Sequence, residues 1–221
     1  LGDIFKHSDL AMYDAKKLGR DRLRFFEPAM QSELEKRTRM EIDLRKALNG
    51  GQFSLFYQKR VNQYGDVKGA EALIRWAHAD GEFVHPIDFI PLAEETGLII
   101  PMGQWVLHEA CRQIMDWEKH HVMRNICVSI NISAKEFAQD DFVGKVQDTL
   151  RATNINPEKL ELEITESMFL DNIAALVDKM QALTATGITF ALDDFGTGYS
   201  SLSYLKRLPL QMILQILIKR N

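Results

Sequence analysis

Ala70-Glu-Ala-Leu-Ile-Arg-Trp76 is a short segment in which polar and apolar residues alternate. Side chains of a β-strand point to opposite faces in turn, so the segment predicts a strand with Glu71, Leu73 and Arg75 on one face. The other face is apolar throughout and suits a buried sheet. An acid and a base therefore share the face on which a closed sheet would ordinarily carry aliphatic side chains.

Further strands and amphipathic helices alternate along the chain on either side of this segment. The predicted strands cover residues 53–61, 67–76, 126–133, 160–165 and 189–193, and the predicted helices cover residues 87–96, 104–120, 142–152, 173–186 and 200–208. This order predicts an α/β fold with a mostly parallel sheet and helices outside it. Only a short turn at residues 62–66 separates the first two strands, so these two are expected to pair antiparallel.

The part of the chain before the first strand has a different character. Residues 1–27 predict one helix and a short strand at residues 22–26, too little chain to form a core alone. Residues 28–48 form a polar helical stretch that ends at Asn49-Gly50-Gly51. The expected organisation is a small N-terminal unit (1–27), a connecting helix (28–48) and a main domain (49–221).

Bulk properties narrow the class of protein. The 221 residues carry a formal net charge of −4, which gives no basic footprint for a nucleic acid polymer and no polybasic membrane anchor. No apolar run is long enough to span a bilayer, no signal peptide is recognisable, and two cysteines without metal-ligand spacing predict reduced thiols in the cytoplasm. The chain begins at Leu1 rather than Met, which leaves open a longer parent protein with an upstream sensory or membrane segment.

Acidic and amide side chains recur at the ends of four predicted strands. Besides Glu71 these are Asn131 in Ser129-Ile-Asn-Ile-Ser133, the acids of Glu161-Leu-Glu-Ile-Thr-Glu166, and the adjacent pair Asp193-Asp194. Several carboxylates facing one another repel unless cations compensate. Oxygen-only ligands suit Mg²⁺ or Mn²⁺, and two such ions would bind a phosphodiester and activate a water. Strand phase alone does not decide among Glu161, Glu163 and Glu166.

Each of these residues also has a purely structural interpretation. A single glutamate near a strand end is commonly a salt-bridge partner, and Glu161 is expected to be such a surface residue. Asn131 alone could bond the backbone in the core, and Asp193-Asp194 before Phe195-Gly-Thr-Gly could serve only as turn and cap residues. Acids on successive strands with the same phase favour the metal-site hypothesis.

The same segments resemble the EAL domain family of bacterial signalling proteins. The resemblance rests on five blocks that occur in the order of the family: Glu71-Ala-Leu-Ile-Arg-Trp76, Pro86-Ile-Asp-Phe-Ile-Pro-Leu-Ala-Glu-Glu-Thr-Gly-Leu98, Ser129-Ile-Asn-Ile-Ser133, Glu161-Leu-Glu-Ile-Thr-Glu-Ser167 and Asp193-Asp-Phe-Gly-Thr-Gly-Tyr-Ser-Ser201. The resemblance implies a TIM-like (β/α) barrel with one antiparallel strand. It also implies metal-dependent hydrolysis of cyclic di-GMP to linear pGpG by a two-metal Mg²⁺ or Mn²⁺ site.

Roles for individual residues follow from the resemblance position by position. It implies five metal ligands, three substrate-binding residues and a glutamate that stabilises the loop after the last acidic pair and couples the site to a homodimer. The implied metal ligands are Glu71, Asn131, Glu163, Asp193 and Asp194, the implied substrate contacts are Gln58, Leu73 and Arg75, and the loop-stabilising glutamate is Glu166. Glu71, Asp193 and Glu166 are the residues on which catalysis is expected to depend.

The N-terminal unit resembles the end of a GGDEF domain. Asp9-Leu-Ala-Met-Tyr13 and Lys16-Lys-Leu-Gly-Arg20 carry this second resemblance, while the GGDEF motif itself does not occur in the chain. The resemblance implies a parent protein with GGDEF and EAL domains in tandem and no cyclase activity in this chain.

Two departures from the EAL pattern keep a second hypothesis open. Lys59 stands where the family usually has proline, and Leu214 stands where the family has a lysine that helps position the attacking water. The barrel is expected to be incomplete at its C-terminus, with residues 211–218 as a last exposed strand and low stability. The alternative to hydrolysis is therefore a degenerate EAL module that binds cyclic di-GMP or a protein partner without catalysis, or a remnant of a disrupted gene.

Overall fold

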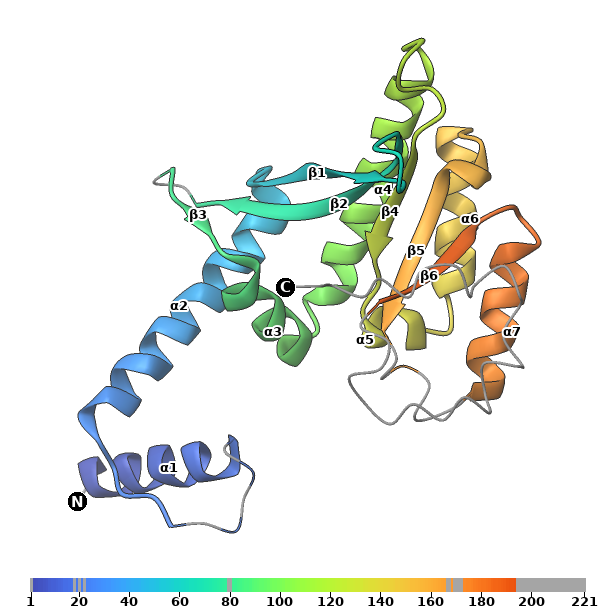
Figure 1. Cartoon of the computed structure of the whole chain (residues 1–221). Coiled ribbons are helices and arrows are strands. Elements are labelled where there is room, and N and C mark those ends of the chain that lie inside the picture. The colour runs from blue at the N-terminus through green and yellow to red at the C-terminus, as the bar shows by residue number, and fades with distance from the viewer. Residues whose placement is uncertain are drawn as a thin grey trace.

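The computed structural model describes residues 2–17, 19, 21, 23–78, 81–165, 168 and 173–193. In chain order its elements are α1 (Gly2–Lys17), α2 (Pro28–Gly50), β1 (Phe53–Val61), β2 (Val67–Ala77), β3 (Phe83–Val84), α3 (Pro86–Thr96), α4 (Ile99–Glu118), β4 (Cys127–Asn131), α5 (Ala134–Ala138), α6 (Phe142–Thr153), η1 (Pro157–Lys159), β5 (Leu160–Thr165), α7 (Ile173–Thr184) and β6 (Thr189–Asp193). The alternation of strands and helices confirms the predicted α/β class (Figure 1).

One sheet organises the main domain. Its strand order is β1-β2-β4-β5-β6, with β3 paired to β2. As predicted, β1 and β2 form an antiparallel hairpin, while β2, β4, β5 and β6 are parallel neighbours. Parallel neighbours need a crossover connection, and helices supply it between each successive pair. The carboxyl ends of the parallel strands consequently lie at one edge of the sheet.

Helices α4, α6 and α7 cover one face of this sheet (Figure 1). The side chains that β4 and β5 direct to this face are fully buried: Val128, Ile130, Leu160, Leu162 and Ile164 all have an exposed fraction of 0%. A second apolar cluster joins the end of α2 to Trp76 and to Phe89 of α3. The strand residues among them belong to the apolar phase of β2, β4 and β5, so the polar phase is left for the opposite face.

Helix ends differ from the predicted ones for local reasons. Helix α4 begins at Ile99, five residues before the predicted start at 104. Pro101 lies in its first turn, where no intrahelical N–H donor is needed, so this proline does not exclude a helix. Helix α3 begins with Pro86 and ends at Thr96, and its C-cap residue Gly97 adopts φ 77° in the left-handed region.

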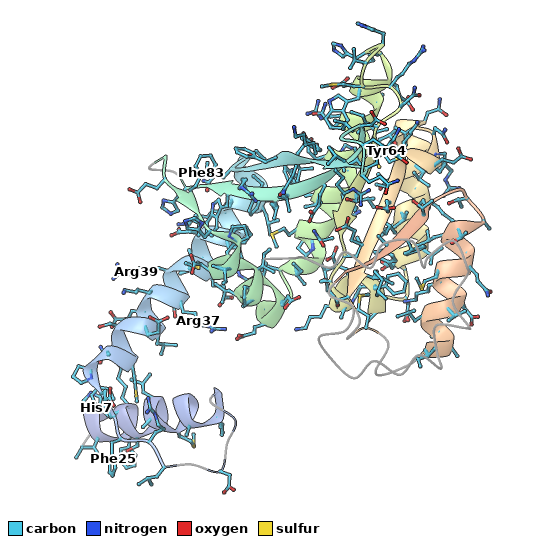
Figure 2. The ribbon with its side chains drawn as sticks, in the orientation of Figure 1. His7, Phe25, Arg37, Arg39, Tyr64 and Phe83 are labelled. Atoms are coloured by element: carbon cyan, nitrogen blue, oxygen red, sulfur yellow. The ribbon has the colours of Figure 1, made fainter. Side chains whose placement is uncertain are left out.

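The N-terminal unit lies at the far end of α2 from the sheet (Figure 1). Described residues 23–27 form no strand, so the strand predicted at 22–26 is wrong; strand pairing in the described part of the chain involves β1 to β6 alone. The unit is held by a stacked pair of His7 and Phe26 rings with centroids 3.7 Å apart. Figure 2 shows His7 and Phe25 here, and Arg37 on α2, where it forms an ion pair with Glu95 of α3.

Among the described helices, none combines the length and the apolar character required to cross a bilayer.

Candidate functional site

Polar side chains occupy the sheet face opposite the helices, and the strand register places them in two rows. In the first row Gln58 of β1 is paired with Glu71 of β2, Glu71 with Ser129 of β4, and Ser129 with Glu161 of β5. In the second row Asn131 of β4 is paired with Glu163 of β5. The second row lies nearer to the carboxyl edge of the sheet. Register thus brings together residues that are up to about 100 positions apart in the chain.

Direct contacts tie the two rows to each other. The Asn131 side chain donates a hydrogen bond from Nδ2 to Glu71 Oε1 at 2.9 Å. From β1, Arg60 Nη1 lies 3.0 Å from Glu163 Oε1 and 2.6 Å from Glu161 Oε1. The site therefore combines three carboxylates, two amides, one hydroxyl and one guanidinium on a single sheet face.

Burial gives this cluster unusual electrostatics. The Glu163 side chain is only 9% exposed. Burial raises the pKa of Glu163; the Ser129 hydroxyl and the Arg60 guanidinium act in the opposite direction, and the neighbouring charges of Glu71 and Glu161 raise this pKa further. A carboxyl group in this setting gains much from a cation close to its oxygens.

A pocket of about 310 Å³ adjoins the carboxyl edge of β2 and β4. Leu73, Arg75, Asn131 and Thr165 line it together with apolar side chains of α3 and α4 and with Glu136 of α5. Arg75 Nη1 donates a hydrogen bond to the Ile74 carbonyl oxygen at 2.8 Å, and its guanidinium lies 5.5 Å from the centroid of the Phe56 ring. The size falls within the usual range for small-molecule sites, and the lining combines apolar walls with a few polar groups.

The oxygen chemistry of these residues fits a hard divalent cation. Within the described ranges no three carboxylate, histidine or cysteine side chains form a cluster that could hold a metal ion by themselves. The expected ligand set, however, also uses the Asn131 amide and the acids at 193 and 194. Glu71 and Asn131 already share a hydrogen bond, and Glu163 is a buried carboxyl group with acidic neighbours. Such donors suit Mg²⁺ or Mn²⁺ rather than zinc.

Comparison with known protein families identifies the domain that carries this site. The EAL domain matches residues 41–214, which is most of the chain. The chain belongs to the EAL domain family. Its fold is accordingly that of a TIM-like barrel, of which the mostly parallel sheet is the described part. Dependence on divalent metal ions is a general property of phosphodiesterases in this family.

Characterised relatives agree with this assignment. The bifunctional diguanylate cyclase/cyclic di-GMP phosphodiesterase MucR of Pseudomonas aeruginosa is 43% identical over 209 residues, covering 94% of this chain and 30% of MucR. The cyclic di-GMP phosphodiesterase PdeR of Escherichia coli is 37% identical over 210 residues, covering 95% of this chain and 32% of PdeR. The chain thus spans about a third of the length of these two relatives.

A solved structure resembles the fold directly. The phosphodiesterase of MucR in complex with cyclic di-GMP superposes with a TM-score of 0.73 at 43% sequence identity, covering 77% of this chain and 69% of that one. This similarity supports the EAL fold for the 77% of this chain that it covers.

The predicted site residues of the EAL domain fall into three groups. Glu71, Asn131 and Glu163 are brought together as described, with Gln58 beside Glu71. Leu73 and Arg75 line the adjacent pocket. The backbone of Asp193 ends β6 in register with Thr165, whereas its side chain, Asp194 and Glu166 lie outside the described residues. The roles of all these residues remain predictions.

One structural interpretation is confirmed only in part. Glu161 is a salt-bridge partner as expected, because it forms an ion pair with Arg60, but its side chain is 20% exposed and lies on the polar sheet face rather than at the surface. The period of two places Glu161 and Glu163 on the same face, so an environment that buries one also encloses the other. Glu161 lies one row further from the carboxyl edge than Glu163, which distinguishes the two where strand phase could not.

Sequence reasoning also missed two contributors. Arg60 carries no periodic or motif signal, since its partners lie about 100 residues away. Glu136 did carry a motif signal, because Ser133-Ala-Lys-Glu136 has the spacing of a capping box. Ser133 Oγ accepts a hydrogen bond from the Glu136 N–H at 3.2 Å, and Glu136 Oε2 accepts one from the Ser133 N–H at 3.0 Å.

Proposed function

We propose that this chain hydrolyses cyclic di-GMP to linear pGpG at a centre of two Mg²⁺ or Mn²⁺ ions, as a component of bacterial second-messenger signalling. The proposal rests on one structural observation above all others. Glu71, Asn131 and Glu163 come from three neighbouring parallel strands; Asn131 and Glu163 lie near the carboxyl edge, where barrel enzymes carry their chemistry, and Glu71 accepts a hydrogen bond from Asn131. Family membership and the names of MucR and PdeR supply the substrate and the reaction.

The metal ions, when bound, would polarise the scissile phosphodiester and lower the pKa of a water molecule. The residues of the chain hold and orient the reacting groups. We assign Glu71, Asn131, Glu163, Asp193 and Asp194 as the ligands. Their oxygens also offset the charge of the ions, which a buried face of this kind requires.

Substrate contacts lie beside the ligands in this proposal. Arg75 lines the pocket with a guanidinium that suits a phosphate oxygen, and Leu73 offers an apolar contact on the same strand. Gln58 stands next to Glu71 in the hairpin and can donate hydrogen bonds across it. Glu166 is assigned to the loop after Asp194 and to its coupling with a homodimer.

A direct hydrolysis assay tests the proposal. The purified chain is incubated with cyclic di-GMP and Mg²⁺ or Mn²⁺, and pGpG is quantified by chromatography. Glu71→Ala should lower the rate by about 100-fold or more, since loss of a ligand costs at least as much as loss of a group that supports one. Glu33→Ala is the matched control, because Glu33 is exposed on α2, away from the sheet. A chelator should abolish the reaction, and added Mn²⁺ should restore it.

A second candidate is binding without hydrolysis. Leu214 in place of the family lysine that helps position the attacking water favours it. If folded protein forms no pGpG but is stabilised against heat by cyclic di-GMP, the chain is a binding module. If neither product nor stabilisation is found, both candidates fail.

We further propose that residues 1–27 are the end of a GGDEF domain, residues 28–48 a connecting helix and residues 49–221 the EAL domain of a cytoplasmic portion of the parent protein. Exposed apolar side chains on the N-terminal unit support a covering domain, since Phe5, Leu23 and Phe25 are 68%, 80% and 75% exposed. Expression with the upstream sequence should protect these residues from solvent in hydrogen-exchange measurements.

A further inference from the structure

Arg60 lies on the polar sheet face, beneath the residues assigned as metal ligands. It is paired with Gly69 in the β1–β2 hairpin, two residues before Glu71 on β2. Its guanidinium nevertheless contacts acids of β5, at 2.6 Å from Glu161 and 3.0 Å from Glu163. Between β1 and β5 lie β2 and β4, so the Arg60 side chain extends across two strands.

Small residues make this path possible. A Cβ atom on Gly69 would lie 3.1 Å from Arg60 Nη2, 3.3 Å from Nε and 3.0 Å from the Cys127 carbonyl oxygen. The next interior position on β4 is Ser129, which is fully buried and stands between Glu71 and Glu161 in the register. The interior of the hairpin is thus shaped to admit a long side chain from β1.

The contacts of Arg60 differ from those of the other arginine in the site. Its side chain is 18% exposed, and its two acidic partners are 20% and 9% exposed. Arg75 lies at the opposite end of the same face, lines the pocket and rests over Phe56. Arg75 is placed to contact substrate, whereas Arg60 is enclosed below the ligands and forms ion pairs with two acids of β5.

We propose that Arg60 is a positioning residue of the metal centre: it fixes the Glu163 carboxylate beside Asn131 and neutralises Glu161, so that the ligand oxygens are in place before the cation binds. The inference rests on the proposed metal centre. A carboxylate that already accepts a hydrogen bond through one of its oxygens has fewer orientations to lose on binding a metal ion. The contact with Arg60 is made by Oε1 of Glu163, at 3.0 Å from Arg60 Nη1.

The test measures Mn²⁺ affinity directly, by electron paramagnetic resonance of free Mn²⁺, alongside hydrolysis. Arg60→Met keeps the apolar stem and removes the charge, and we expect its Mn²⁺ dissociation constant to rise by about 10- to 100-fold. Arg60→Lys keeps the positive charge without the planar guanidinium, so its Mn²⁺ dissociation constant should lie between those of the wild type and Arg60→Met. Hydrolysis by Arg60→Met should recover in large part at saturating Mn²⁺, which a loss of fold would not allow.

Two controls separate positioning from a general change of charge. Lys59→Met makes the same charge change at the neighbouring, exposed position on β1 and should leave the Mn²⁺ affinity unchanged within about twofold. Arg60→Met combined with Glu161→Gln restores the local charge balance. If Arg60 positions Glu163, this double variant should still bind Mn²⁺ weakly.

Distinct outcomes identify what has failed. Mn²⁺ affinity that is equal or higher in folded Arg60→Met overturns the positioning role, because Arg60 would then only occupy the place of the cation. If Arg60→Met does not fold, equal affinity of Arg60→Lys and the wild type overturns it instead. A wild-type chain that binds Mn²⁺ without forming pGpG contradicts the proposed hydrolysis and leaves the affinity comparison decisive. If the wild-type chain does not bind Mn²⁺, the proposed metal centre and the positioning role of Arg60 are both contradicted.

Discussion

Gly103 in helix α4 is the position at which a single methyl group should have the clearest effect. A Cβ atom there would lie 1.4 Å from Glu136 Oε1 and 2.2 Å from Glu136 Cδ, far inside van der Waals contact. The Glu136 side chain must therefore move in Gly103→Ala. Glu136 is only 6% exposed, and its Oε2 accepts hydrogen bonds from Ser133 Oγ at 2.6 Å and from the Ser133 N–H at 3.0 Å.

Three contributions determine the magnitude. Loss of a helix cap costs about 0.5–2 kcal/mol, and overpacking of a closed interior costs about 1–3 kcal/mol. Alanine in place of glycine inside a helix, by contrast, stabilises the folded state by about 1 kcal/mol. The free energy of unfolding of Gly103→Ala should therefore fall by about 0.5–4 kcal/mol.

Gly144 in helix α6 provides the matched comparison. It is exposed, and nothing lies within 4 Å of the Cβ atom that alanine would add. Gly144→Ala should then raise the free energy of unfolding by up to about 1 kcal/mol through helix propensity alone. Urea unfolding followed by circular dichroism measures both variants, with the dependence on urea concentration checked for a constant slope.

A double variant shows whether Glu136 is responsible. In a Glu136→Ala background the obstructing carboxylate is gone, and Gly103→Ala should become neutral or stabilising. Gly103→Ala as stable as Gly144→Ala would refute the packing argument. An equal loss of stability with and without Glu136 would show that another neighbour of Gly103 is responsible.

Three further perturbations test burial and protonation. Burial raises the pKa of Glu136 from its ordinary 4.5 to about 7, so the folded state holds this proton more tightly than the unfolded state. The free energy of unfolding should thus fall by about 3 kcal/mol between pH 4.5 and pH 7, a component that Glu136→Gln should remove from urea titrations. Burial also raises the pKa of Cys111 to about 12, so a thiol reagent should modify the half-buried Cys127 first in native protein and both cysteines in urea. Ile164→Ala removes a side chain with 0% exposure and should cost about 2–5 kcal/mol in thermal or urea unfolding, whereas Ile87→Ala, at 81% exposure, should change stability by less than about 0.5 kcal/mol.

Strand positions could be predicted closely because the period of two is a property of the local backbone. The bounds predicted for β1, β5 and β6 match the structure, and the predicted antiparallel hairpin is present. The same period identified the face that carries Glu71, Asn131 and Glu163. Family resemblance was needed to choose Glu163 over Glu161, since both share that phase and differ only in their row of the sheet.

Interactions that depend on the end of an element were harder to predict. The strand predicted to continue to Ser133 ends at Asn131, and Ser133 instead caps helix α5. An apolar residue at 132 extends the alternation, so the period alone gives no reason to stop there. The capping hydrogen bonds of Ser133 and Glu136 compete with strand pairing at this point, and a pattern of hydropathy does not record them.

Long-range pairs leave no local pattern at all. Nothing near Arg60 in the chain indicates that it meets Glu161 and Glu163, because the contact depends on strand order and on the absence of a side chain at Gly69. Such a contact becomes visible only when β1, β2, β4 and β5 are placed in one sheet. The residues that support a site are for this reason less predictable than the residues that form it.

The polar sheet face explains why the residues that form the site depend on the residues that support it. Closed sheets are normally filled with branched aliphatic side chains, yet the interior positions of this one include Gly69, Glu71, Ser129, Asn131, Glu161 and Glu163. Such a face gains little from the hydrophobic effect, so its order depends on charge pairing within it. Arg60 supplies one positive charge from below, and a divalent cation at the carboxyl edge would supply the rest. Stability and metal binding should consequently be coupled in this domain, and residues that hold the acids in place should influence both.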